Sequence, residues 1–459
     1  MTKDLTQGSP TRLILQFSFP LMLGFLLQQF YNFVDTAIVG KTLGLDALAA
    51  VGSTSSLNFL ILGFCMGVCS GFSIPVAQAF GARDIPRMRR FVVNAALLSA
   101  AFALVITALT VTLCPAMLGA TRTPDNIRQD AYAYIVVIFA FIPVTIFYNF
   151  LSSVIRALGD SRTPVIFLIM AALLNIALDF WFILGLKLGV TGAALATGLS
   201  QLAAGLGCLF MGVRHMDALT FHKKDWRWQW PYVKRLFVQG VPMGLQFSIT
   251  AVGSVILAAS VNTLGSGAVA AVTAGSKISM FFCCVFDALA STITTYAGQN
   301  VGAGRVDRIR QGVASCAVLG GIYCLVALAV VYFAGHGLIG LFVEESQAQA
   351  ADDAYRFLLA NALFYLPLLF VNVLRLMIQG VGYTGLAVMA GVFEMAARTL
   401  MGLVVVPALG FGAACFASPL AWVFADAFLF PASVSVLRKL EQKNLSRGVD
   451  RGGILVAKE

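Results

Sequence analysis

Apolar residues fill most of this chain, in long runs separated by short polar connections. A helix needs about 20 mostly apolar residues to cross the hydrocarbon core of a membrane. Twelve stretches reach that length, and they cover residues 13–39, 47–78, 91–113, 130–155, 164–184, 189–211, 233–260, 268–297, 312–334, 354–378, 386–406 and 411–436. Unpaired backbone groups in lipid cost several kcal/mol each, and the runs lack the alternation of barrel strands. The pattern therefore predicts an all-α polytopic membrane protein with 12 transmembrane helices.

The composition excludes two other classes of protein. Of the 459 residues, 59% are apolar and 11% are charged, whereas soluble proteins carry about 25% charged residues. Disorder is excluded because it requires low hydrophobicity and high charge. The nine cysteines are scattered, almost all of them within the apolar runs. This placement predicts small buried side chains, and neither a disulfide framework nor a zinc site.

The basic residues indicate the orientation in the membrane. An even number of spans places both ends of the chain on one side. The connections on that side hold 23 of the 31 Lys and Arg residues, and the connections on the opposite side hold 4. Basic connections stay cytoplasmic, so we expect a multi-pass protein of the plasma (inner) membrane with both termini in the cytoplasm. The net charge of +10 is then explained without a nucleic-acid partner.

The two halves of the chain resemble each other at an offset of about 221 residues. Residues 43–51 read LGLDALAAV where 264–272 read LGSGAVAAV, and QAFGAR at 78–83 is answered by QNVGAG at 299–304. Each half has six spans, so we expect two six-helix lobes related by a pseudo-two-fold axis along the membrane normal, with a cleft between them. The predicted parts are the N-lobe with helices 1–6 (1–211), a cytoplasmic linker (212–232), the C-lobe with helices 7–12 (233–436) and a basic cytoplasmic tail (437–459).

Five acidic residues lie inside the predicted spans: Asp35, Asp179, Asp287, Glu394 and Asp426. Each costs at least about 2.5–3.5 kcal/mol at a helix centre, so each needs a partner or a function. In the first span a single helical face carries Pro20, Gly24, Gln28, Tyr31 and Asp35. The proline removes a backbone hydrogen bond and permits the helix to bend. The same face also carries the hydrogen-bonding side chains of Gln28, Tyr31 and Asp35.

Two further helical faces carry polar residues four positions apart. Asn175 and Asp179 share a face of the fifth span, and Thr197 and Gln201 share a face of the sixth. Carboxylate, amide and hydroxyl oxygens suit a small hard cation. They would equally serve a proton, because two carboxylates close together in a low dielectric cannot both stay charged. The sequence leaves both coupling ions open, Na⁺ or H⁺.

The second half does not repeat this set. In the second half, Ile256 occupies the position equivalent to Asp35, and the position equivalent to Asp179 lies near Gly402. Glu394 and Arg398 are four apart in the eleventh span, which predicts a structural ion pair. The residues that we expect to line a substrate cavity, with aromatic and Met side chains predominating, are Phe30, Tyr31, Tyr148, Met280, Phe281, Phe282, Phe286 and Asp287.

The chain resembles the multidrug and toxic compound extrusion (MATE) family. The resemblance covers nearly the whole chain and rests on FPLMLGFLLQQFYNFVDTAIVG in the first span, AQAFGARD after the second, RALGDSRTP at 156–164 and NIALD in the fifth span. It implies export of cationic and amphiphilic compounds in exchange for Na⁺ or H⁺. For the N-lobe-coupled branch it implies a cation site at Asp35, Asn175, Asp179 and Thr197, with support from Pro20, Gln28 and Tyr134. Another branch couples through acids in the seventh and tenth helices, which this chain lacks within those spans.

We therefore expect a secondary active antiporter, not an enzyme, coupled through Asp35 and Asp179 with a bend of the first helix at Pro20. It would need no cofactor beyond the coupling ion, and its partners would be a small-molecule substrate and the lipid bilayer, as a monomer. One alternative is a flippase for lipid-linked sugars, which would need Lys277, Arg375 or Arg398 in the cleft to hold pyrophosphate. A second alternative is an intramembrane aspartyl enzyme, although the second acid sits in IALDFW and not in G-x-G-D.

Overall fold

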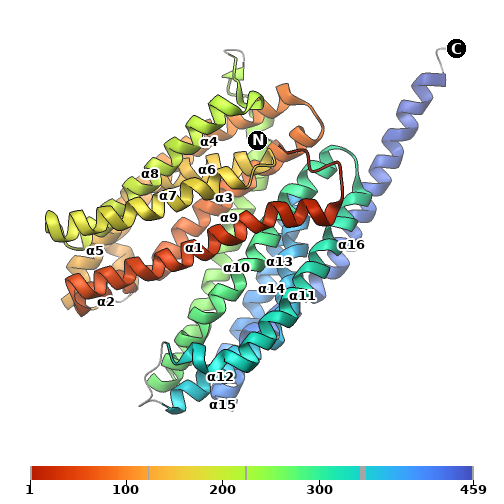
Figure 1. The fold of residues 1–459 in the computed structure, drawn as a ribbon. Helices are drawn as coiled ribbons and strands as arrows, with labels where there is room; N and C mark the ends of the chain where they lie inside the picture. The colour runs from red at the N-terminus through yellow and green to blue at the C-terminus, as the bar shows by residue number, and fades with distance from the viewer. Residues whose placement is uncertain (1–2, 122, 223–224, 342–347, 457–459) are drawn as a thin grey trace. The chain divides into compact units, whose positions relative to one another are not determined.

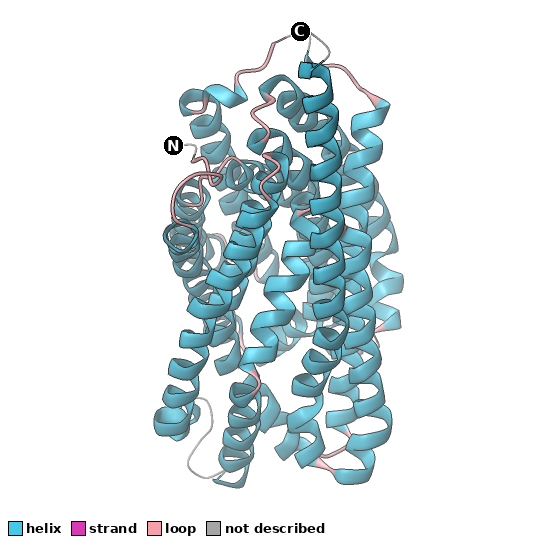
Figure 2. Cartoon of the chain, turned by 90° about the vertical axis from the view of Figure 1, so that its right-hand side faces the viewer, coloured by secondary structure: helices cyan, strands magenta, loops and turns pink. Residues whose placement is uncertain are grey.

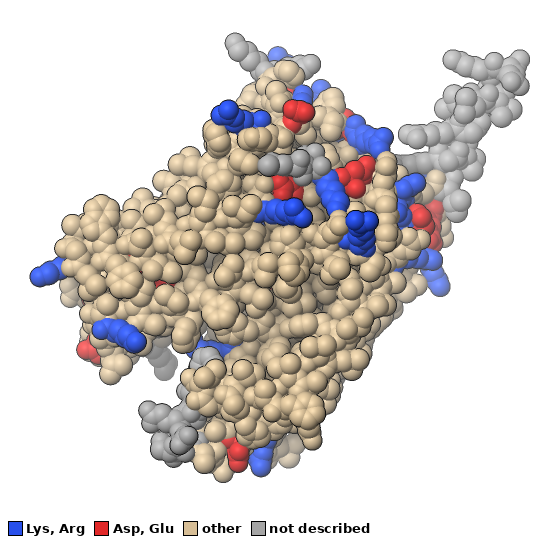
Figure 3. Space-filling model, viewed as in Figure 1, with Lys and Arg blue, Asp and Glu red and all other residues tan. Residues whose placement is uncertain are grey.

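A computed structural model describes residues 3–121, 123–222, 225–341 and 348–456, with side chains described as far as Asn444. These segments consist of helices joined by turns and loops, and they contain no strand (Figures 1 and 2). On the face shown in Figure 3, broad uncharged surfaces follow the helices, and most charged side chains gather near helix ends. The all-α fold class is confirmed. The predicted basic tail begins inside the last helix, and its side chains beyond Asn444 lie outside the described part.

Contacts along the chain define two compact units. Unit 1 consists of Met1–Lys3, Gln16–Ala77 and Asp84–Val255, and unit 2 consists of Asp4–Leu15, Gln78–Arg83 and Ile256–Glu459. The helices before the linker are α1 (Pro10–Leu43), α2 (Leu45–Ser53), α3 (Ser55–Gly81), α4 (Ile85–Ala120), α5 (Asp125–Ala140), α6 (Ile142–Ala157), α7 (Arg162–Asp179), the π-helical turn η1 (Phe180–Gly185) and α8 (Val190–His215). The lobe boundaries expected from the repeat stay a prediction.

The linker contains one short 3₁₀ turn, η2 (Asp217–Leu219). The helices after it are α9 (Trp230–Asn262), α10 (Ser266–Gly302), α11 (Val306–Ile339), α12 (Ala348–Leu363), α13 (Tyr365–Gly380), α14 (Thr384–Leu400), the π-helical turn η5 (Met401–Val405), α15 (Val406–Leu409) and α16 (Phe411–Val456). Within unit 2, α16 packs against α12, α13 and α14.

Among the described residues, ten helices are long and apolar enough to span a membrane, or up to twelve when each of two bent pairs is counted as one span. The pair α5–α6 bends by 46° and the pair α12–α13 by 51°. These bends interrupt the fourth and tenth predicted spans. Pro143 and Pro367 lie just after the two breaks, and a proline without an N–H cannot continue the hydrogen-bond ladder of the preceding turn.

The second predicted span, 47–78, is also not a single helix. It divides into α2 and α3 at Thr54, a fully buried residue whose hydroxyl donates to the Val51 carbonyl at 2.7 Å. A hydroxyl bonded to the preceding turn competes with the helical ladder and can end a helix locally. Residues 52–56 read GSTSS, so a short polar run interrupts the apolar stretch where the helix breaks.

Residues with a left-handed backbone conformation recur at the offset of about 221 residues that relates the two halves of the sequence. Left-handed φ angles occur in three matched pairs, namely Gly44 (90°) with Gly265 (97°), Arg83 (58°) with Gly304 (73°), and Gly189 (60°) with Gly410 (71°). The π-helical turns η1 and η5 begin at the same offset. Such φ angles are costly for most residues, so their recurrence shows that both halves follow one backbone plan.

Two glycines of a G-x-x-x-G pattern in α3, Gly67 and Gly71, allow close packing of α3 against α9 within unit 1. A Cβ on Gly67 would lie 2.6 Å from the Met243 carbonyl oxygen, and a Cβ on Gly71 would lie 2.5 Å from the Gly240 Cα. Real side chains do not tolerate these distances, so the helix backbones touch only because both positions lack a side chain. The pattern is a packing motif, as the spacing predicts.

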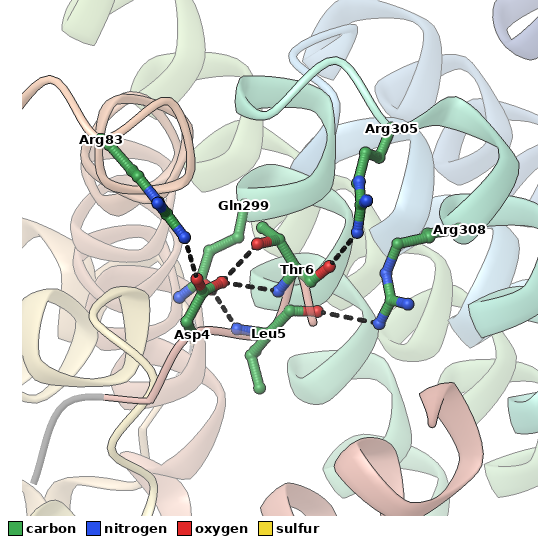
Figure 4. A network of polar contacts seen from close by, with 7 residues as sticks. All are labelled: Asp4, Leu5, Thr6, Arg83, Gln299, Arg305 and Arg308. Carbon is green, nitrogen blue, oxygen red and sulfur yellow. Dashed lines mark hydrogen bonds and ion pairs between the residues drawn. The ribbon is translucent and has the colours of Figure 1, made fainter. Parts of the chain in front are cut away.

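The segment before α1 is bound into unit 2 through its backbone (Figure 4). The Leu5 N–H donates to the Gln299 side chain at 2.9 Å. The Leu5 carbonyl accepts from Arg308 at 3.4 Å, and the Thr6 carbonyl accepts from Arg305 at 2.7 Å. These bonds are made by backbone groups of the segment, so they depend on its backbone conformation more than on its side chains.

Asp4 supplies the side-chain contacts of this segment. Burial raises the pKa of its carboxyl, but hydrogen bonds from Thr6 and the charge of Arg83 outweigh burial and leave the pKa lowered. The Thr6 N–H lies 2.8 Å and the Arg83 guanidinium 3.4 Å from the carboxylate (Figure 4). A lowered pKa in the folded state means that the stabilisation is complete above the unfolded pKa and is lost as the pH falls through the folded one.

We expect Asp4→Ala to loosen this segment without affecting the helices. The substitution removes an acceptor of the Thr6 N–H and the ion pair with Arg83, at a cost of about 1 kcal/mol per lost hydrogen bond. Hydrogen–deuterium exchange with mass spectrometry should show several-fold faster exchange at residues 4–9 alone. The control is Asp46→Ala, which alters an exposed acid on α2. Unchanged exchange at residues 4–9 would contradict the assignment.

Candidate functional site

The fifth-span pair lies at the end of α7, deep inside unit 1. Asn175 and Asp179 are both completely buried, and α7 changes into the π-helical turn η1 directly after Asp179. A π-helical turn shifts the backbone ladder by one residue and is often found at functional positions. The two polar side chains therefore occupy a locally irregular part of the helix, which hydropathy alone does not reveal.

The Asn175 amide joins three helices. Its oxygen accepts from the Thr197 N–H of α8 at 3.0 Å. Its nitrogen donates to the Asp179 Oδ2 at 2.8 Å and to the Tyr31 hydroxyl of α1 at 3.2 Å. This orientation satisfies donors and acceptors on both ends of the amide, as a buried amide requires.

Asp35 of α1 and Asp179 of α7 meet side chain to side chain. Their carboxyl groups are close enough to share a hydrogen bond when one of them carries a proton. The Oδ1 atom of each acid is buried and has no hydrogen-bond partner among the described residues. A hydrogen bond between two carboxyl groups requires a proton on one of them, because two carboxylates are acceptors only. The pair can therefore hold one proton between its two groups, and it has open oxygens for an additional ligand.

The polar neighbours of the acid pair include several residues predicted from sequence. The Tyr31 hydroxyl lies near Thr197, and the buried Tyr134 of α5 lies within electrostatic range of both acids. Gln28, Tyr31, Thr197 and Gln201 line one small cavity of roughly 50 Å³ next to the pair, together with apolar residues of α7. The structure thus brings the predicted polar residues of four helices into one place.

Two residues of this region are not apparent from the sequence patterns. Thr145 of α6 donates its hydroxyl proton to the Gln201 side chain at 2.8 Å, and Ser200 lines the same small cavity. Thr145 belongs to a helix that contributes none of the predicted coupling residues, and Ser200 lies three residues after Thr197 on α8. Their participation depends on the packing of α6 and α8, which are in extensive contact.

Pro20 lies within α1, which continues as one helix through it. One turn later, Gly24 brings α1 close to α7, because a Cβ there would lie 2.9 Å from a Val165 methyl group. The proline leaves one backbone carbonyl of the preceding turn without its helical donor. The helix can therefore bend at this point at lower cost than elsewhere.

The predicted cavity-lining residues belong to different units. Phe30 and Tyr148 are part of unit 1, whereas Met280, Phe281, Phe282 and Asp287 are part of unit 2. Phe286 does not fit the prediction, because it is completely buried and packs edge-to-face on Tyr323 and Tyr365. It is a core residue of unit 2, and the other cavity residues stay a prediction.

Glu394 and Arg398 form a buried ion pair at 2.6 Å. Arg375 of α13 is a further partner, with its guanidinium 2.6 Å from the other carboxylate oxygen. The sequence spacing indicated only the pair, since Arg375 comes from a different helix. Both arginines are bonded to Glu394 and at most 7% exposed, so neither is presented to a ligand such as pyrophosphate in an open cleft.

The bundle of long apolar helices with an internal repeat and a buried polar centre defines a polytopic membrane transporter. A family model, MatE, matches residues 20–181 and 242–404. The chain therefore belongs to the MatE family, whose members are transporters and not enzymes.

Individual relatives agree with this assignment. "Probable multidrug resistance protein YpnP" of Bacillus subtilis (strain 168) is 30% identical over 370 residues, which cover 80% of this chain and 82% of the relative. "Multidrug export protein MepA" of Staphylococcus aureus (strain NCTC 8325 / PS 47) is 24% identical and covers 82% of this chain and 84% of its own length. The fold is shared with a solved "multidrug resistance MATE family transporter" in an outward-facing conformation, at a TM-score of 0.89, 22% identity, and 96% and 99% coverage.

Proposed function

We propose that the protein exports amphiphilic or cationic small molecules in exchange for a cation that binds at Asp35 and Asp179. The relatives named as multidrug resistance and multidrug export proteins support the substrate class. The observation that carries the coupling site is the close approach of the half-buried Asp35 carboxyl group to the fully buried one of Asp179. Two carboxyl groups that share one proton can take up or release a proton, and so change their total charge, with little movement of the side chains.

The cation acts by binding one conformation better than another. A ligand shifts an equilibrium only by its differential affinity for the two states. Cation binding at the acid pair neutralises charge next to α1, so α1 can bend at Pro20 and the cavity can release its substrate. Loss of the cation restores the charged pair and the straight helix. Asn175, Thr197 and Tyr31 hold the acids in place during this exchange.

The geometry favours a proton as the coupling ion. The two close carboxyl groups can share one proton, whereas Na⁺ would have to separate the two acids and recruit oxygens of Asn175 and Thr197. Na⁺ at Asp35, Asn175, Asp179 and Thr197 is the competing proposal, since all four offer oxygen ligands. The two proposals differ in which gradient drives transport.

Proteoliposomes loaded with ethidium can separate these coupling ions. We expect an imposed pH gradient to drive ethidium movement in vesicles at zero Na⁺, and a Na⁺ gradient at equal pH to have no effect. Transport driven by a Na⁺ gradient alone would rule out the proton as the coupling ion. Absence of transport with either gradient would rule out cation-coupled antiport. A labelled lipid-linked sugar in the same vesicles tests the flippase alternative, which the pairing of Arg375 and Arg398 with Glu394 disfavours.

We infer from the charge distribution that the protein lies in the plasma membrane with both termini in the cytoplasm. We also propose that the transporter functions as a monomer. Single cysteines placed in the linker should be inaccessible to a membrane-impermeant thiol reagent in intact cells. Labelling from outside would contradict this orientation. Light scattering of the purified protein in detergent measures its oligomeric state.

A further inference from the structure

A group of charged residues is buried inside unit 2, where three helices pack together. The members are Arg375 on α13, Glu394 and Arg398 on α14, and Asp426 on α16, and they are only 4–7% exposed. The exchange proposed above does not use them. Burying four ionisable side chains in a membrane protein is expensive, and such residues are functional candidates by default.

The charges of this group balance only if Asp426 is ionised. Glu394 binds both arginines at 2.6 Å, which leaves one uncompensated positive charge. Asp426 lies within electrostatic range of Arg375 and Glu394, and its carboxylate would neutralise that charge. When Asp426 carries a proton, the group has a net positive charge. Proton binding at Asp426 therefore changes the charge of a buried centre.

The hydrogen bonds of the group are incomplete in this structure. In the part of the chain that the structure describes, Arg375 Nε, Arg398 Nη1 and Asp426 Oδ1 are buried atoms with no hydrogen-bond partner. Leaving a buried donor or acceptor unpaired costs about 1–3 kcal/mol. Arg375 lies within electrostatic range of Asp426, so its open Nε donor and the open carboxyl oxygen of Asp426 are available to each other. The centre thus has a second arrangement available, in which an ionised Asp426 is bonded to arginine.

The internal repeat shows that the fold does not require these charges. Gly189 and Gly410, and the π-helical turns before them, align the two halves at the offset of about 221 residues. At that offset the first half has Leu173, Ala177 and Gly205 where the second half has Glu394, Arg398 and Asp426. The same backbone plan is therefore built without any charge at these three positions, and helix packing alone does not explain the charges.

A proline and a groove follow Asp426 along α16. Pro431 lies one turn beyond Asp426 and lacks an N–H, so the Ala427 carbonyl loses its helical donor. An open groove lined by Phe430, Val434, Arg438 and Lys439 begins at this turn and follows α16 towards its basic end. The proposal below requires water to reach Asp426 from this groove, past the turn that Pro431 weakens.

We propose that Asp426 is a second proton-binding site, which exchanges a proton with the cytoplasmic water during each transport cycle. On release, the O–H bond of the Asp426 carboxyl breaks, the proton passes to water in the groove, and the carboxylate accepts an N–H bond from Arg375. On uptake, the reverse occurs. This inference rests on the proposed function, because it adds a second proton to the same cycle.

The charged groups on the other helices that pack against α16 lie near helix ends. Arg310 of α11 pairs with Glu441 of α16 at 2.9 Å in an exposed position. On α12, Asp352, Asp353 and Arg356 lie within its first turns. The pH response of Asp426 is therefore controlled mainly by Arg375, Glu394 and Arg398.

Infrared difference spectroscopy of the full chain in lipid vesicles tests the proposal without measuring transport. At constant pH, addition of ethidium should change the C=O stretching band of a protonated carboxyl group. We expect this band to disappear in Asp426→Asn, to shift in frequency in Asp426→Glu, and to persist in Asp35→Asn. In transport assays, Asp426→Asn should move fewer protons per ethidium than the unaltered chain. Glu441→Gln, which changes an exposed acid on the same helix, should match the unaltered chain in both assays.

The outcomes separate this inference from the proposed function. Absence of proton-driven efflux in the unaltered protein would overturn the proposed function, whereas the infrared band reports on Asp426 directly. The inference is overturned if the ethidium-induced band is the same in Asp426→Asn, or if Asp426→Glu leaves its frequency unchanged. The four residues would then be a fixed ionic cluster. If Asp426→Asn does not accumulate, the frequency shift in Asp426→Glu decides by itself.

Discussion

Replacing Asp35 with asparagine is expected to reduce gradient-driven ethidium efflux to the level of vesicles without protein. Asparagine has the size of aspartate and can still hydrogen-bond to Asp179. It cannot take up or release a proton, and it carries no charge to attract a cation. Because the two acids lie close enough to share one proton, the exchange needs both carboxyl groups. Initial efflux rates at matched protein density measure the effect.

Two further variants make this result specific. Asp179→Asn should abolish efflux equally, since it removes the other half of the pair. Asp46→Asn makes the same chemical change at an exposed position of α2 and should leave efflux unchanged. Near-normal efflux in Asp35→Asn would show that this acid does not couple transport. Retained ethidium binding in the inactive variants would separate a loss of coupling from a loss of folding.

Glu394→Gln is expected to cause the largest loss of stability. Glu394 is the carboxylate that both Arg375 and Arg398 contact at 2.6 Å, and all three are buried. Removing one partner of a buried ion pair leaves uncompensated charge and costs about 3–5 kcal/mol. The measurement is thermal unfolding of the purified protein in detergent, monitored by tryptophan fluorescence. The variant should unfold at a clearly lower temperature.

The control for this stability effect is Glu441→Gln. Its ion pair with Arg310 is exposed, and exposed pairs contribute only about 0–1 kcal/mol. Replacing all three buried residues, as Arg375→Met, Glu394→Leu and Arg398→Met, should recover much of the stability because no charge then remains unpaired within the trio. Equal unfolding temperatures for Glu394→Gln and Glu441→Gln would contradict this account.

Spacing along single helices identified part of the candidate site from the sequence. Asn175 and Asp179 lie on one face of α7, and Tyr31 and Asp35 on one face of α1, because residues three or four apart share a helical face. The same rule identified Glu394 and Arg398. It could not identify Arg375 or Thr145, since each joins its cluster from another helix. The expectation that aromatic side chains line the cavity included Phe286, although that side chain is buried in the core of unit 2.

The sequence by itself determined that the chain forms membrane-spanning helices, how they repeat, and which faces carry polar groups. It could do so because a backbone in lipid must satisfy its hydrogen bonds within each segment, and because helical periodicity is a local property. Only the tertiary structure decided which polar faces meet, that Arg375 joins Glu394, and that Phe286 packs into the core of unit 2. Those features depend on side chains from distant segments that pack in three dimensions, and hydropathy along the chain does not record them.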